Sequence, residues 1–141
     1  MKELNPYRVP EFVLAGNATV TIKSAVTNRH FTYKIMQSEK PELYFIHLLR
    51  GPDNEEDYSY VGCYYRDSRY FHPCKRYCDI PRRSRSVAMQ AIEYFLEHLY
   101  DIPHDLLVYH EGKCARCGRK LTTPESIERG FGPECLKEVA I

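Results

Sequence analysis

Three cysteines in the last third of this 141-residue chain are spaced like metal ligands. Two residues separate Cys114 from Cys117, which allows both sulfurs to face one point, and the glycine that follows suits a tight turn. Pro133 fits the first turn of a helix, so Cys135 is expected in that turn, where the helix N-terminus favours a thiolate. A lone C-x-x-C is also a redox motif, but redox pairs usually open a helix inside a βαβ unit, which the sequence does not predict here.

A structural zinc site has four ligands, and His110 is the nearest candidate for the fourth. We therefore predict Zn²⁺ bound by His110, Cys114, Cys117 and Cys135. The alternative is three buried free thiols with a surface histidine. Between the two ligand groups a short helix is expected, with Thr123 as its N-cap, Pro124 in its first turn and Gly130 at its end.

A zinc ion with four protein ligands has no open coordination position, so the predicted metal is structural and no enzyme is expected. If water replaced His110, catalysis would become possible. Glu111 and Glu134 lie beside ligands in the sequence, but surface carboxylates are the commoner explanation. No Ser-His-Asp set, carboxylate pair or phosphate loop is visible, although a site assembled by the fold stays open.

A second group of potential ligands comes earlier in the chain. Cys63, His72, Cys74 and Cys78 could bind another metal, but one and three intervening residues are a poor spacing for a metal knuckle, and Pro73 restricts the turn. We favour free thiols and a surface histidine here.

The elements that must carry these residues are predicted by periodicity. Alternation of β-branched or aromatic residues with polar ones indicates five antiparallel strands, near residues 18–23, 30–35, 43–49, 58–65 and 69–72. Ser86 then caps a helix that should run to about Tyr100 and stop before Pro103. The predicted fold class is α+β: an antiparallel sheet of about five strands packed on one helix, followed by a small C-terminal zinc finger. The predicted domains are an N-terminal extension (1–17), the α+β domain (18–103) and the zinc-finger module (104–141).

Composition limits the classes of function. A charged fraction of 28% and a hydrophobic fraction of 43% are ordinary for a soluble globular protein. No apolar run reaches the roughly 20 residues that a membrane span needs, and the N-terminus lacks a signal-peptide pattern. We expect a cytoplasmic protein, whose six cysteines stay reduced or bind metal.

Charge is unevenly distributed although the formal net charge is only +1. Asp53, Glu55, Glu56 and Asp57 form an acidic cluster, whereas residues 66–85 carry seven lysines and arginines against two aspartates, a local +5. The candidate nucleic-acid-binding residues are Lys75, Arg76, Arg82, Arg83, Arg85, Arg116, Arg119 and Lys120. The plainer interpretation is that these charges are solvated and that most of the twelve tyrosines are strand residues, half of them in the core.

Residues 108–135, VYHEGKCARCGRKLTTPESIERGFGPEC, resemble the ending of an uncharacterised protein family found in bacteriophages, prophages and plasmids, with the motif HEGxCxRCGRxLTxPESIxxGxGPxC. Stretches near Gly16, Arg29 and Leu49 also resemble longer members, so the likeness extends over most of the chain. The resemblance implies a mobile-element origin and supports His110 as a ligand, but supplies no function. Cys74 and Cys78 depart from the family pattern.

Two functions are compatible with these features. The first is a phage or mobile-element accessory protein that binds nucleic acid through basic residues, with exposed tyrosines stacking on bases. The alternative is a protein-binding inhibitor of a host enzyme or defence complex, such as an anti-CRISPR type role. The expected partner is therefore nucleic acid or a host protein complex, and no membrane.

Overall fold

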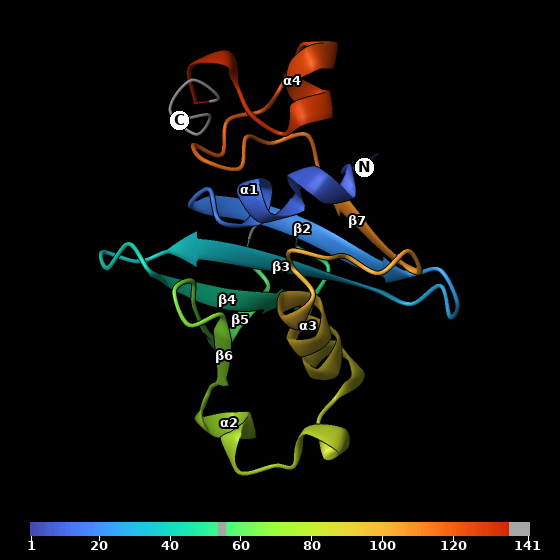
Figure 1. The fold of residues 1–141 in the computed structure, drawn as a ribbon, viewed down its shortest axis with the longest axis vertical. Helices are drawn as coiled ribbons and strands as arrows, with labels where there is room; N and C mark the ends of the chain where they lie inside the picture. The colour runs from blue at the N-terminus through green and yellow to red at the C-terminus, as the bar shows by residue number, and fades with distance from the viewer. Residues whose placement is uncertain (54–55, 136–141) are drawn as a thin grey trace.

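The computed structural model describes residues 1–53 and 56–135, and its centre is a seven-stranded sheet in which every neighbouring pair is antiparallel (Figure 1). The strands are β1 (Lys2–Glu3), β2 (Asn17–Ser24), β3 (His30–Gln37), β4 (Leu43–Leu49), β5 (Tyr58–Tyr65), β6 (Tyr70–Pro73) and β7 (Leu106–His110). Their order across the sheet is β1-β7-β2-β3-β4-β5-β6. Glu55 of the acidic cluster and residues 136–141 of the predicted module lie outside the described residues.

The strand number corrects the sequence prediction. All five predicted strands are present as β2 to β6, but β1 and β7 were missed, so the sheet has seven strands. With two residues, β1 is too short to show an alternation. β7 lies in the segment that the cysteine spacing had assigned to the zinc finger, and it pairs with β2, placing Val20 opposite His110.

Four α-helices and two 3₁₀-helices lie wholly within the described residues. They are η1 (Pro6–Arg8), α1 (Val9–Val13), α2 (Lys75–Cys78), η2 (Arg82–Ser84), α3 (Val87–Glu97) and α4 (Pro124–Arg129). As predicted, Ser86 caps α3, and its Oγ accepts a hydrogen bond from the Met89 N–H at 3.3 Å. The helix ends at Glu97, short of Tyr100, because the chain turns there and the Asp101 N–H donates to the His98 carbonyl. None of the helices in this part of the chain is long and apolar enough to cross a membrane.

Two helices, and not the single one predicted, cover one face of the sheet (Figure 1). The Tyr33 hydroxyl in β3 donates to the Ala88 carbonyl of α3 at 2.6 Å. The Tyr44 hydroxyl in β4 donates at 2.8 Å to the carbonyl of Leu14, the residue after α1. Helix α1 was not predicted from the sequence because the helix is short and carries a proline in its first turn. Residues 1–17 therefore contribute to the core, to which α1 supplies Val9, Phe12 and Val13.

Candidate metal centre

The Sγ atoms of Cys114, Cys117 and Cys135 lie within 4.8 Å of one another. Tetrahedral zinc has Zn–S bonds of about 2.3 Å, which place two sulfur ligands roughly 3.8 Å apart. Cys114 and Cys135 are buried, while Cys117 is exposed. The three thiols therefore have the donor chemistry and the spacing to hold one metal ion.

Cys114 and Cys117 belong to a short turn, residues 113–120, which we call the cysteine hairpin. Its ends pair through an antiparallel bridge between Lys113 and Lys120. Within it the Cys114 N–H donates to the Arg119 carbonyl at 2.8 Å, and the Gly118 N–H donates to the Cys114 carbonyl at 2.9 Å. Gly118 has φ +78°, a conformation that side chains other than glycine rarely adopt, so the predicted turn glycine is required by the backbone.

The backbone of the module also changes the pKa of a cysteine thiol. Burial opposes ionisation of Cys114, but backbone N–H groups of Cys117, Gly132 and Arg116 outweigh it and lower the pKa of Cys114 to about 7. For Cys135, burial is the largest effect and raises its pKa to about 11. These N–H groups thus favour a thiolate at Cys114, the form that binds metal.

Helix α4 returns the chain from the hairpin to the third cysteine. Its ends confirm the sequence prediction: Thr123 Oγ1 accepts from the Ser126 N–H at 3.3 Å, Pro124 opens the helix, and Gly130 ends it with φ +80°. Residues 133–135 are helical, so Cys135 lies in the helical turn predicted for it.

His110 is not part of the three-cysteine group. Its ring is fully buried, 5.4 Å from the Phe12 ring between centroids, because β7 directs it to the helix-covered face. The Gly112 N–H donates to Nδ1 at 3.0 Å, and Nε2 has no hydrogen-bond partner within the described part of the chain. Burial lowers the pKa of His110, which favours the neutral imidazole. The structure thus brings together three of the four predicted ligands, and His110 as the fourth stays a prediction.

The module is fastened to the sheet and to α1. The Ala115 N–H donates to the Gly130 carbonyl at 2.9 Å, and the Ala115 carbonyl accepts from the Asn17 N–H at 2.7 Å. The Phe131 ring, 1% exposed, meets Phe12 edge-on with 6.0 Å between centroids. The contact of Phe131 with the core was not predicted from the sequence, although a single large apolar residue between two glycines can indicate such a contact.

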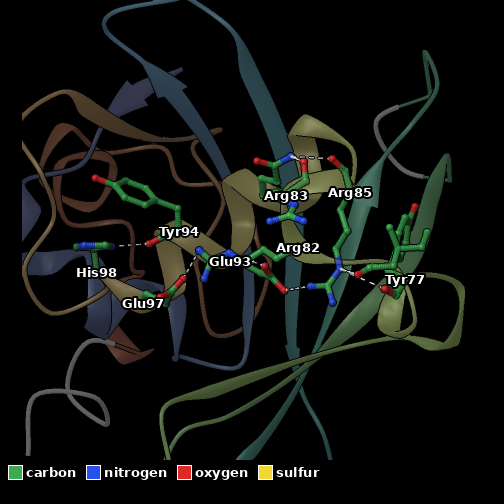
Figure 2. Close-up of polar contacts among 10 residues, drawn as sticks. Tyr77, Arg82, Arg83, Arg85, Glu93, Tyr94, Glu97 and His98 are labelled. Atoms are coloured by element: carbon green, nitrogen blue, oxygen red, sulfur yellow. Dashed lines mark hydrogen bonds and ion pairs between the residues drawn. The ribbon is translucent and has the colours of Figure 1, made fainter.

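Two of the predicted nucleic-acid-binding residues, Arg82 and Arg85, pair with carboxylates of α3 (Figure 2). Arg85 donates from Nη1 to Glu93 Oε1 and from Nε to the carbonyls of Tyr77 and Ile80, at 3.1 and 2.9 Å. Arg82 pairs through Nε with Glu93 Oε2 at 2.9 Å and through Nη2 with Glu97. Glu93 is only 7% exposed. The positive charges of these two arginines are therefore compensated by carboxylates of α3.

The other predicted cations lie at the surface. Lys75, Arg76, Arg83, Arg116, Arg119 and Lys120 are all exposed. Arg116 also extends a guanidinium nitrogen to 3.9 Å from Cys135 Sγ, which places it over the thiol cluster.

The earlier cysteines occupy different surroundings. Cys74 Sγ lies 3.7 Å from the Tyr60 carbonyl oxygen, and Cys78 Sγ lies 3.7 Å from the Lys75 carbonyl oxygen. Cys63 and His72 face each other across β5 and β6. Within the part of the chain that the structure describes, these four residues do not come together in a group of three or more ligands.

Comparison with known proteins gives one match. Residues 108–139 match a family of unknown function, DUF6011. The matched stretch includes most of β7, the cysteine hairpin and α4, in agreement with the resemblance of residues 108–135 to an uncharacterised family. No curated protein and no solved structure matches the chain.

Proposed function

We propose that this chain is a non-enzymatic nucleic-acid-binding protein whose cysteine hairpin is organised by a structural zinc ion. The observation that carries the proposal is the charge around the thiol cluster. Residues 113–120 contain four cations, Lys113, Arg116, Arg119 and Lys120, and no carboxylate. A compact cationic turn of this kind attracts phosphates, and binding to it releases counterions from the nucleic acid.

Zinc is the metal that best suits the donors. Three thiolates and an imidazole are soft and borderline ligands, which favour zinc over magnesium or calcium. For the fourth position we propose His110, whose buried Nε2 has no hydrogen-bond partner among the described residues. To bind the metal, Nε2 must carry no proton, so the proton of the neutral ring would move to Nδ1 and the hydrogen bond from the Gly112 N–H would be lost. With four protein ligands no position remains for water, so the proposed role of the metal is structural.

The metal would act mainly on the hairpin. In isolated finger peptides zinc binding contributes about 10–16 kcal/mol and drives folding. Here β7 and the Phe12–Phe131 contact already attach the module to the core. We therefore expect metal removal to loosen residues 113–135 while the sheet stays folded.

Among the predicted cations we give most weight to Arg119 and Lys120. Both are exposed side chains of the hairpin. Lys75, Arg76 and Arg83 are a second possible phosphate-contacting group, whereas Arg82 and Arg85 have carboxylate partners and are left out of the proposed surface. A mobile-element origin is also part of the proposal and is supported only by the resemblance of residues 108–135.

Fluorescence anisotropy with labelled single-stranded and duplex DNA and RNA tests the proposal, at about 50 and 200 mM salt, with the zinc-loaded protein and with protein treated with a chelator. We expect binding that weakens strongly with salt and weakens further without metal. Failure of all four probes to bind at the lower salt would overturn the proposal and favour the host-protein alternative.

A further inference from the structure

The sheet has one face that the helices α1 and α3 do not cover. Strand alternation places Lys34, Phe45, His47, Tyr60, Tyr70 and His72 on it, and we call this surface the open face. Their neighbours along the strands, among them Tyr33, Ile46 and Tyr64, point to the other side and are fully buried. The open face is therefore a separate surface of β3 to β6.

Large aromatic rings are exposed to solvent on the open face. Phe45, Tyr60 and Tyr70 are 37%, 42% and 57% exposed. Their rings contact neighbouring rings: Phe45 and Tyr60, on adjacent strands, meet edge-on at 6.0 Å, and Tyr70 and His72, both in β6, lie 4.4 Å apart between centroids. Exposed rings held in place in this way lose little conformational freedom when a planar ligand stacks on them.

The strands that form the open face carry no acidic side chain. Strands β2 to β7, all of them among the described residues, contain no aspartate and no glutamate. Lys34 stands in the middle strand β3, with its ammonium 4.3 Å from the centre of the Tyr58 ring. A sheet face that combines exposed aromatic rings with lysine and lacks carboxylates suits a planar, negatively charged polymer.

We propose that the open face binds single-stranded nucleic acid, with bases stacked on Phe45, Tyr60 and Tyr70 and Lys34 beside the phosphate backbone. This inference rests on the proposed function and specifies its ligand. Bases in a duplex already stack on one another and hide their faces, so aromatic side chains select single strands. An acidic or aromatic protein segment would be the other occupant, and the test below separates the two.

The test compares a labelled thymidine oligonucleotide with a duplex of equal length in anisotropy titrations. The variant Tyr60→Val/Tyr70→Val removes two rings and keeps side chains that suit a strand. The control Tyr7→Ala/Tyr94→Ala removes two exposed tyrosines that lie outside the strands, at 94% and 40% exposure. We expect the strand variant to lose about a hundred-fold in affinity for the single strand and little for the duplex, since each of the two stacks contributes about ten-fold. The control should bind like wild type.

A second measurement does not depend on the variants folding. Photo-crosslinking of wild-type protein to an oligonucleotide that carries halogenated uracil, followed by mass spectrometry, should label peptides that contain Phe45, Tyr60 or Tyr70. Crosslinks confined to residues 113–120, or an unchanged affinity of the folded strand variant, would overturn the inference and leave the proposed function standing. Absence of binding by wild type to every probe at low salt would overturn both.

Discussion

Two arginine-rich segments of this protein look alike in the sequence and differ in the structure. Residues 82–85 lie beside α3, where Arg82 and Arg85 are paired with the buried Glu93. Residues 113–120 form the cysteine hairpin, whose own sequence contains four cations and no carboxylate, and whose Arg119 and Lys120 are exposed. Arg82 and Arg85 show that a local excess of positive charge in a sequence need not be available to a ligand, because the fold can place carboxylates against it.

The largest effect is expected from Glu93→Gln. This change leaves Arg85, whose side chain is 11% exposed, without its carboxylate in a buried site, so the free energy of unfolding should fall by about 3 kcal/mol. Urea denaturation measures it. Glu97→Gln is the matched control: Glu97 pairs with Arg82 at 51% exposure, and its loss should cost about 0.5 kcal/mol. Equal, small effects of both variants would show that Arg82 and Arg85 do not depend on Glu93.

The next effect concerns the attachment of the hairpin. A Cβ on Gly130 would lie 2.5 Å from the Phe12 ring, and Gly130 has φ +80°, which strains any other residue. Gly130→Ala should therefore destabilise the protein by about 2–3 kcal/mol, through the clash and the backbone strain together. Gly112 has φ +82° but open space around it, and Gly112→Ala should cost only the strain, about 1 kcal/mol. Thermal unfolding measures the loss of stability in each variant, and the difference between the two losses is the contribution of the clash. If the two lose the same stability, the Phe12 contact does not hold the module.

A smaller effect tests the charges directly. Replacing Arg119 and Lys120 with glutamine should weaken nucleic-acid binding and reduce the slope of log affinity against log salt by about 2, since each phosphate contact contributes about one. The same change at Lys75 and Arg76 removes two exposed cations from α2 and measures the contribution of the second basic segment. A larger change of slope in the α2 variant would reverse the ranking of the two segments.

What could be predicted from the sequence was local. The cysteine spacing, the ends of α4 and the alternation in β2 to β6 each depend on residues close together in the chain, and the structure agrees with them. The thiol cluster could be predicted because the ligand types and their spacing indicate metal binding almost directly.

What could not be predicted depends on distant contacts. β7 becomes a strand by pairing with β2, from which most of the chain separates it, and that pairing directs His110 toward Phe12. Had β7 been recognised, its alternation would have placed His110 on the same face as Val108, which is buried. The pairing of Arg85 with Glu93 likewise depends on how α3 lies on the sheet, and no local pattern gives that orientation.

The most direct test of the account is the metal content of protein purified without added metal, compared with Cys135→Ser and His110→Ala and with Cys78→Ser as a control outside the cluster. We expect about one zinc per chain in wild type and in the control, none in Cys135→Ser, and weaker retention in His110→Ala. Wild-type protein that carries no zinc and takes up none when titrated would contradict it.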